Sequence, residues 1–457
     1  MRLREVTMAE RVVLYPAQMA AMGKAIAASL GCPAAVCTAD AKAAAGDDAV
    51  LCWDVFPSAS SEKDPNIKVK FEALIGKHVV LLLSQDDTSS AFAQLSLLLW
   101  LQRFYVPKPL ESGAKRKWKD TVGSGAFDMA SVASLTVVVP WYRYCQMERT
   151  SRWAYKTDGD KPGWTNSVPD GGWLDVPTAQ AYAALLSADP APPPGTTNVE
   201  VPALPPKQIL FIDIHDDLNG PPVVECALSK TGKWANPVVQ YDVVTGNGTY
   251  FASAFAYFLA HTYLPQLEGS LETKMVIFPD VGAYTRFHTM VETTLAGIPK
   301  ANVLFIEKKR VGTQVEQSET LNYMAEDGSQ QARESLPSGS TILIPDDFTN
   351  SGSTLFGGAK IVKSKVQGEA KAISAFVSHF VAKYDRAVVD KFVTQVYSEG
   401  GYASAMDTFY CTDSIPNTTS WLQEEVAKRV AAGQPKRVVV DTVAPLVCEW
   451  VSKRPLA

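Results

Sequence analysis

The chain has 457 residues, which is enough for two or three domains of ordinary size, and its 46% hydrophobic and 20% charged residues are typical of a soluble globular protein. A net charge of −5 argues against a general nucleic-acid binder, and no apolar run is long enough to span a membrane. The seven cysteines form no CxxC pair, so neither a zinc knuckle nor a disulfide framework is indicated, and we expect a cytoplasmic location.

Short apolar runs recur along the chain, and several are followed by a stretch with helical spacing. The expected strands are, in chain order, 12–15, 79–83, 135–139, 209–212, 275–278, 303–306, 342–344 and 373–377, with helices expected over 17–30 and 91–104. Because the runs are apolar throughout rather than alternating, they predict strands buried on both faces. Alternation of such strands with helices predicts parallel sheets covered by helices. We interpret the polar or proline-rich segments 107–129, 151–173, 189–206 and 316–340 as surface insertions.

The segment 341–354 carries the strongest functional signal. It reads as a strand that ends in Asp346 and Asp347, then a short loop over Asn350–Ser353, then a helix that opens at Thr354. A helix N-terminus favours a phosphate, and a glycine lets the backbone approach it closely. Two carboxylates would repel a phosphate but suit vicinal hydroxyl groups. The loop therefore predicts a sugar-phosphate site, although a plain Asp/Ser/Gly surface loop is the simpler alternative.

Three further strand ends carry polar groups. Asp213 and His215 occupy alternate positions after one strand, so their side chains could face the same side. Asp280 follows a proline at the end of the next, and a cationic cluster, Lys308–Arg310, ends another. Each has an ordinary explanation, since a lone histidine is usually structural, an aspartate after proline usually caps a helix, and a basic run is usually solvated.

The order and spacing of these motifs together resemble ribose-phosphate pyrophosphokinases, and most closely their plant-type class II branch. The matching segments are Asp213–His215, Phe278–His288, Lys308–Arg310, Asp346–Thr354, Val377–His379 and Thr412–Pro416. The resemblance implies an α/β protein with two type I phosphoribosyltransferase-like domains, each a parallel sheet flanked by helices. We place the domains at 1–222 and 223–457, and expect the last strand, near 437–441, to rejoin the first domain.

The resemblance also implies transfer of pyrophosphate from ATP to the C1 hydroxyl of ribose 5-phosphate, with Mg²⁺. The residues implied to bind ribose 5-phosphate are Asp346, Asp347, Asn350, Ser351, Gly352, Ser353 and Thr354. Lys308 and Arg310 would be catalytic, and His215 and Asp280 would hold the metal ion. Glu148, Arg149 and Asp64 are the weaker candidates for ATP binding, because the nucleotide segment departs from the family pattern. A homo-oligomer, alone or mixed with related subunits, is implied as well.

Two alternatives remain at this point. The altered nucleotide segment, the insertions and Ala283 in place of a glycine suit a non-catalytic relative that acts as a binding, regulatory or structural subunit. A phosphoribosyltransferase would share the sugar-phosphate loop, but that class does not call for the motifs at His215 and Asp280.

Overall fold

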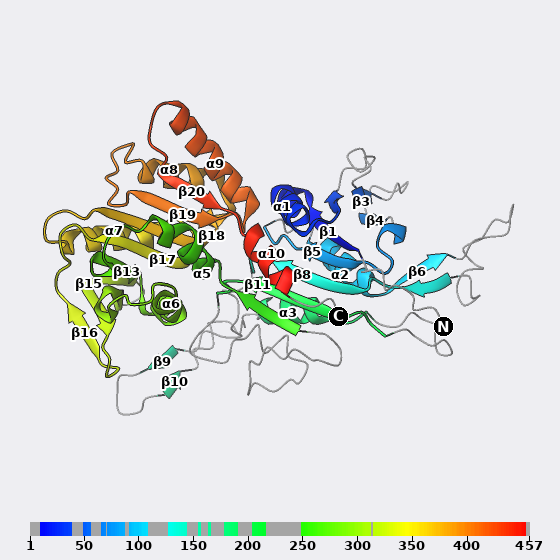
Figure 1. Ribbon diagram of the computed structural model, residues 1–457, viewed down its shortest axis with the longest axis horizontal. Coiled ribbons are helices and arrows are strands. Elements are labelled where there is room, and N and C mark those ends of the chain that lie inside the picture. The colour runs from blue at the N-terminus through cyan, green and yellow to red at the C-terminus, as the bar shows by residue number, and fades with distance from the viewer. Residues whose placement is uncertain are drawn as a thin grey trace.

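The computed structural model describes two large, mostly parallel sheets, each covered by helices on both faces (Figure 1). The described residues are 10–38, 49–55, 65–69, 71–86, 91–107, 127–143, 154–156, 163–165, 178–190, 203–215, 248–311 and 314–453. No helix within these ranges is both long and apolar enough to cross a membrane.

The first sheet is parallel except at one edge, where β3 and β4 run antiparallel. Its strands, in spatial order, are β12 (Gly248–Ala252), β11 (Lys207–Ile212), β8 (Ser134–Val139), β5 (His78–Leu82), β1 (Arg11–Pro16), β2 (Ala34–Thr38), β3 (Ala49–Val55) and β4 (Pro65–Val69). Its helices are α1 (Ala20–Leu30), α2 (Ala91–Gln102) and α3 (Thr178–Ser187), with short 3₁₀ turns at Ala17–Met19 and Phe71–Ala73.

The second sheet is parallel in its centre and antiparallel at one edge. Its strands, in spatial order, are β16 (Gln330–Arg333), β15 (Gln314–Met324), β14 (Val303–Val311), β13 (Lys274–Phe278), β17 (Thr341–Thr349), β18 (Ala372–Phe380), β19 (Thr408–Thr412) and β20 (Val438–Asp441). Its longer helices are α6 (Val281–Thr294), α7 (Ser353–Lys365), α8 (Arg386–Val396) and α9 (Pro416–Ala431). The shorter α5 (Ala254–Phe258) continues into a π-helical turn, Leu259–Tyr263, and 3₁₀ turns lie at Leu264–Gln266, Leu271–Thr273, Lys300–Asn302 and Ala382–Tyr384.

Two small antiparallel ribbons complete the described strands. They pair β6 (Phe104–Pro107) with β7 (Phe127–Ala130), and β9 (Ala154–Lys156) with β10 (Gly163–Thr165).

Both sheets are buried on their two faces, as their continuous apolar strands predict. Along β1, Val12 and Leu14 belong to a cluster with α2 and α3, whereas Val13 and Tyr15 belong to a cluster with α1. In the second sheet, one face packs against α7, α8 and α9, and the other packs against α5 and α6. The predicted α/β fold class is confirmed, and each expected strand coincides with a strand of one of the two sheets.

The polar segment 316–340 is not a plain surface insertion. It forms most of β15 and all of β16, which extend the second sheet beyond β14 in antiparallel fashion. An edge strand needs backbone pairing and at most one buried face, so a polar sequence is compatible with it. The exposed residues of β16 illustrate this, because only Arg333 in that strand is partly buried.

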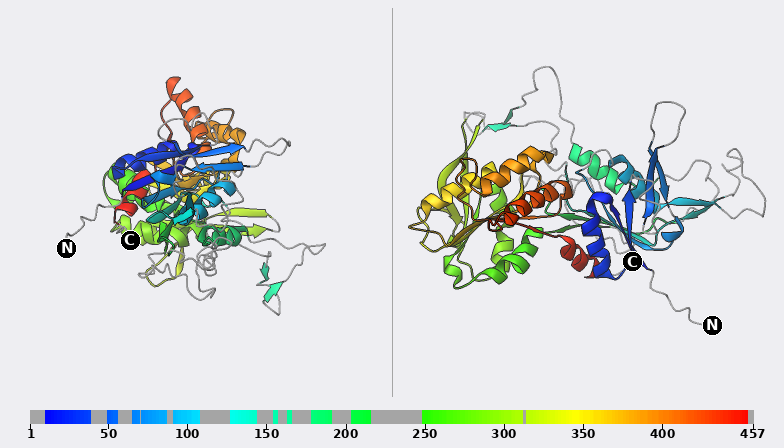
Figure 2. Two further views of the ribbon diagram at one scale, coloured as in Figure 1. Left: turned by 90° about the vertical axis from the view of Figure 1, so that its right-hand side faces the viewer. Right: turned by 90° about the horizontal axis from the view of Figure 1, so that it is seen from above.

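The element that returns to the first sheet near the end of the chain is a helix and not the predicted strand. Strand β20 (Val438–Asp441) pairs in parallel with β19 of the second sheet, so the expectation that this strand rejoins the first domain is wrong. The helix that follows, α10 (Ala444–Lys453), makes the return instead and packs against α1, with Val447 and Val451 in one cluster with Ile26 (Figure 2). An apolar stripe at helical spacing explains this docking.

The first sheet also takes strand β12, which begins at Gly248. The predicted boundary at residue 222 therefore falls before the last strand of that sheet. We place the boundary after Ala252, where α5 begins to pack against the second sheet.

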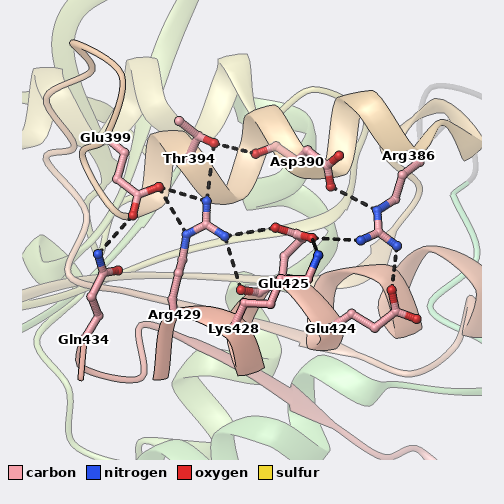
Figure 3. A network of polar contacts seen from close by, with 9 residues as sticks. All are labelled: Arg386, Asp390, Thr394, Glu399, Glu424, Glu425, Lys428, Arg429 and Gln434. Atoms are coloured by element: carbon pink, nitrogen blue, oxygen red, sulfur yellow. Dashed lines mark hydrogen bonds and ion pairs between the residues drawn. The ribbon is translucent and has the colours of Figure 1, made fainter. Parts of the chain in front are cut away.

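A network of ion pairs joins α8 to α9 at the surface of the second sheet (Figure 3). Glu425 accepts hydrogen bonds from Lys428, Arg429 and Arg386, and its side chain is only 13% exposed. The hydrogen bond from Lys428 lowers the pKa of Glu425 to about 2, and those from Arg429 and Arg386 act in the same direction. Because the charges are mutually satisfied, we interpret this network as a structural clamp between two helices.

Candidate functional site

The centre of the candidate site is the buried carboxylate of Asp347, at the end of β17. Its Oδ2 accepts from His215 Nδ1 at 2.6 Å and from the Arg286 guanidinium. These partners come from separate parts of the chain, because His215 follows β11 of the first sheet and Arg286 lies on α6. Three segments distant in the sequence therefore converge at the carboxyl ends of the strands, where ligands of open α/β sheets bind.

Asp347 is held as a carboxylate by its neighbours. The side chain is 3% exposed, and burial alone would raise its pKa. The charges of Arg286 and His215 outweigh burial and bring the pKa well below its ordinary value. Its other oxygen, Oδ1, accepts from the Phe348 amide at 2.9 Å. Both oxygens are thus engaged with the protein, so Asp347 organises the site.

Asp346 has the opposite electrostatic environment. Burial raises its pKa well above the ordinary value, and the negative charges of Asp347 and Asp280 raise it further. Its Oδ1 accepts from the Asp347 amide at 3.0 Å, and its side chain shares a hydrogen bond with the side chain of Asp347. A carboxyl group placed beside two others suits a ligand that supplies positive charge or hydroxyl donors.

Asp280 is the N-cap of α6, since its Oδ1 accepts from the Ala283 amide at 2.9 Å. This is the ordinary role of an aspartate at such a position, and it stabilises the helix that carries Arg286. The influence of Asp280 on the pKa of Asp346 nevertheless brings the two carboxylates into one site. Asp280 can therefore serve both as a helix cap and as part of an acidic pair.

The loop after β17 has the predicted strand–loop–helix form, and α7 begins at Ser353, one residue before the predicted position. Gly352 adopts a left-handed conformation (φ +77°) as the N-cap of α7, and its amide donates to Thr349 Oγ1 at 3.1 Å. A Cβ atom built on Gly352 would lie 2.5 Å from Phe392 of α8 and 2.8 Å from Phe356. Both backbone conformation and packing therefore require glycine here.

Lys308 and Arg310 lie in the second half of β14, where it pairs with β15 as an antiparallel ribbon. Their backbone partners are Gln317 and Val315, after a register shift between Ile306 and Lys308. The positions of their side chains lie outside what the structure describes, as do Asp64, Glu148 and Arg149.

Asp213 does not share a face with His215, in contrast to the expectation from strand alternation. Its backbone has φ +37°, which ends the extended conformation of β11. The carboxylate of Asp213 turns inward to Ser378 Oγ and the Phe255 amide, whereas His215 turns to Asp347. The left-handed conformation of Asp213 thus turns its own side chain into the protein interior and leaves His215 to face the site.

Two residues of the site region have roles that the motifs did not predict. Arg286 was matched as part of a motif, but its pairing with Asp347 depends on α6 lying beside β17, which local spacing does not reveal. His379, in an otherwise largely apolar strand, is fully buried and contacts Asp213 and Ser414. The matched segment Val377–His379 was the available signal for it, but it did not reveal the contact with Asp213.

Among the described residues, no group of three or more His, Cys, Asp or Glu is arranged to hold a metal ion by itself. Mg²⁺ usually keeps several waters and takes few protein ligands, one or two of them carboxylates. The pair formed by Asp346 and Asp280 fits that demand, because their mutual repulsion is relieved by a cation. Because His215 uses Nδ1 for Asp347, Nε2 is the ring atom that could bind a metal ion, through its lone pair when the ring is neutral.

The similarities to known proteins agree with this geometry. No protein-family model matches the chain. Ribose-phosphate pyrophosphokinase 4 of Arabidopsis thaliana is 24% identical over 349 residues, which cover 75% of this chain and 70% of that protein. The crystal structure of phosphoribosylpyrophosphate synthetase from Mycobacterium smegmatis superposes with a TM-score of 0.50 at 15% identity, over 97% of this chain and 98% of that one.

The plant relative is consistent with the plant-type branch that the motifs indicate, and the solved structure shares the fold of two parallel sheets. In sequence the chain is thus similar to a plant ribose-phosphate pyrophosphokinase, and its fold is similar to that of a phosphoribosylpyrophosphate synthetase.

Proposed function

We propose that the protein is a ribose-phosphate diphosphokinase, which transfers the terminal pyrophosphate of ATP to the C1 hydroxyl of ribose 5-phosphate. The observation that carries this proposal is the meeting of His215, Arg286 and Asp347 beside the loop over Asn350–Thr354. A plain surface loop would not require two partners from distant segments around one buried carboxylate.

The loop supplies the features that ribose 5-phosphate needs. The N-terminus of α7, with Ser351 and Ser353, would bind the 5-phosphate through backbone amides and hydroxyl groups. Asp346 would accept from the ribose hydroxyls in place of its bonds to the neighbouring Asp347, because Asp347 is held by His215, Arg286 and the Phe348 amide. In this assignment Asp347 keeps its neighbours in place and Asp346 contacts the sugar.

Mg²⁺ bound with the ATP phosphates would neutralise the negative charge that spreads during transfer. Asp280 and Asp346 are the described carboxylates that would hold it, with the ATP phosphates and water supplying the other ligands. The ribbon of β14 and β15 would bring Lys308 and Arg310 toward the phosphates. Loss of one such cation is expected to lower the rate by about 100-fold, by analogy with oxyanion donors.

The transfer itself needs alignment more than covalent help from the protein. The C1 oxygen of ribose 5-phosphate forms a bond to the β-phosphorus of ATP, the bond from that phosphorus to the oxygen bridging to the α-phosphorus breaks, and AMP leaves. The C1 hydroxyl proton is released. The products are phosphoribosyl pyrophosphate and AMP.

The test is to incubate the protein with ATP, Mg²⁺ and ribose 5-phosphate and to measure AMP by chromatography. We expect AMP only when ribose 5-phosphate is present, with loss of about 100-fold or more in Asp346→Asn. Asp327→Asn is the matched control, because Asp327 is an exposed aspartate in the turn between β15 and β16 whose carboxylate accepts from Ser329. Absence of AMP under varied phosphate and nucleotide would refute the enzyme proposal.

A non-catalytic relative that binds sugar phosphate is the second candidate. The observation in its favour is that Asp347 is already neutralised by Arg286 and His215, so this carboxylate needs no ligand. Binding of ribose 5-phosphate by calorimetry without turnover would support it. Release of pyrophosphate from phosphoribosyl pyrophosphate with a nucleobase would instead indicate a phosphoribosyltransferase.

A further inference from the structure

Asp213 is the strained residue at which the chain leaves the first sheet. Its φ of +37° lies in the left-handed region, which is unfavourable for an L-residue and which Asp and Asn tolerate better than most. Strain of this kind persists only where the surroundings impose it. The contacts of Asp213 show which surroundings do so.

The backbone of Asp213 is bonded at both of its polar groups. Its amide donates to the Ala252 carbonyl, at the end of β12, at 3.0 Å. Its carbonyl accepts from His379 Nε2, on β18, at 3.0 Å. The residue is therefore tied to the first sheet on one side and to the second sheet on the other.

The carboxylate of Asp213 adds contacts on the side of the second sheet. Oδ2 accepts from the Phe255 amide at 2.9 Å and from Ser378 Oγ at 2.5 Å, and the residue is 8% exposed. Ser253, the N-cap of α5, also hydrogen-bonds this carboxylate. Together with the backbone bond to Ala252 of the first sheet, these directional contacts define the orientation of Asp213.

His379 is itself fixed. It is fully buried, its Nδ1 is 2.8 Å from Ser414 Oγ, and its ring centroid is 4.5 Å from that of Trp141, which follows β8. A carbonyl can only accept, so Nε2 of His379 must carry the proton. Burial lowers the pKa of His379 to about 4, which keeps the ring neutral near pH 7 and makes its tautomer definite.

These contacts decide the direction of His215. In a continued strand, residues 213 and 215 would point to the same side. The left-handed turn breaks that alternation, so Asp213 enters the contact between the sheets while His215, 32% exposed, faces Asp347. We propose that Asp213, held by Ser378 and His379, is a positioning residue that aims the imidazole of His215 at Asp347. Its consequence for catalysis rests on the proposed pyrophosphokinase function, whereas its structural effect does not.

The structural effect is tested with protein labelled with ¹⁵N at its five histidines, observed by nuclear magnetic resonance and assigned by single substitutions. In the unaltered protein, Nδ1 of His215 should carry a proton, because it donates to the ionised Asp347. Asp213→Ala should convert His215 to a mixture of tautomers, since the alanine offers no acceptor and tolerates a positive φ poorly. Asp213→Asn should preserve the signal, because asparagine tolerates this backbone conformation and its oxygen can accept from Phe255 and Ser378.

An unchanged His215 signal in a folded Asp213→Ala protein would overturn the proposal, and so would equal loss of the signal in Asp213→Asn. Circular dichroism establishes that each variant is folded. If Asp213→Ala fails to fold, Ser378→Ala removes only one hydroxyl and should still shift the His215 signal. Failure of that variant to shift it would count against the proposal.

Measurements of kcat distinguish a loss of His215 positioning from a general loss of structure. If the unaltered protein makes AMP, Asp213→Ala should lower kcat about 10-fold or more, and Asp213→Asn should restore it. In a His215→Ala background, Asp213→Ala should add less than about 2-fold, because a residue acting through another loses its effect when that one is absent. Full additivity would overturn the proposal. If the unaltered protein makes no AMP, the proposed function fails while the resonance measurement still decides the positioning role.

Discussion

Substitution of Gly352 by alanine tests whether the sugar-phosphate loop is shaped by packing as well as by backbone conformation. The left-handed conformation (φ +77°) alone should cost about 1–2 kcal/mol in an alanine. The new Cβ would also lie 2.5 Å from Phe392, and inserting a carbon into a packed core costs about 1–3 kcal/mol more. We therefore expect Gly352→Ala to lower the free energy of unfolding by roughly 2–5 kcal/mol.

The matched control is Gly328→Ala. Gly328 has nearly the same φ, +79°, but no atom lies within 4 Å of a Cβ built on it. It should lose only the conformational part, about 1–2 kcal/mol. Thermal unfolding followed by circular dichroism measures the difference, which at about 2–4 °C per kcal/mol should separate the two midpoints by several degrees.

A second substitution isolates the contact. Phe392→Leu should recover part of the loss in the Gly352→Ala background, because the smaller side chain leaves room for the added carbon. Equal destabilisation by Gly352→Ala and Gly328→Ala, with no recovery, would refute the packing argument. Calorimetric titration with ribose 5-phosphate should in addition show weaker binding in Gly352→Ala alone.

Three further predictions concern ion pairs and packing elsewhere. Arg286→Met should leave the buried carboxylate of Asp347 without its main cation, which should raise the pKa of that carboxyl and destabilise the protein by about 3 kcal/mol. Urea unfolding at pH 7 measures the loss of stability, and a loss below about 1 kcal/mol would contradict the prediction. The lowered pKa of Glu425 contributes stability that is present above its ordinary pKa of 4.5 and is lost as the pH falls toward about 2. Glu425→Gln should therefore flatten the dependence of the melting temperature on pH between about 5 and 2. An unchanged slope would show that the ion pairs between α8 and α9 are not the source of this pH dependence. Val447→Ala should lower the free energy of unfolding by about 2 kcal/mol, because the Val447 side chain of α10 is fully buried against α1. A melting temperature equal to that of the unaltered protein would show that the packing of α10 does not contribute to stability.

At the acidic end of β17, the local sequence predicted the secondary structure but not the electrostatic environment of the two aspartates. The strand–loop–helix form over residues 341–354 was predictable, since apolar content, two carboxylates and Gly352 are local signals for those elements. The contrast between Asp346 and Asp347 was not. Adjacent and identical in type, they differ because Arg286 and His215 reach only one of them, and both partners arrive from other elements.

The last strand was likewise predictable from local sequence, whereas the sheet that it joins was not. The apolar run 438–441 identified a strand, but not which sheet it would join, because a short parallel strand can pair with either. Its pairing with β19 depends on where α9 delivers the chain, and α10 then makes the crossing that the strand was expected to make.

By itself, the sequence determined the helix-covered parallel sheets, because hydrophobic periodicity and turn chemistry act over a few neighbouring residues. The resemblance to a known family implied that there are two such sheets and pointed to most of the candidate residues. Only the tertiary structure decided which of those residues meet, which carboxylate is neutralised, and which direction the chain takes at Asp213. Those outcomes depend on contacts between segments far apart along the chain, and each contact exists only once both sheets are assembled against each other.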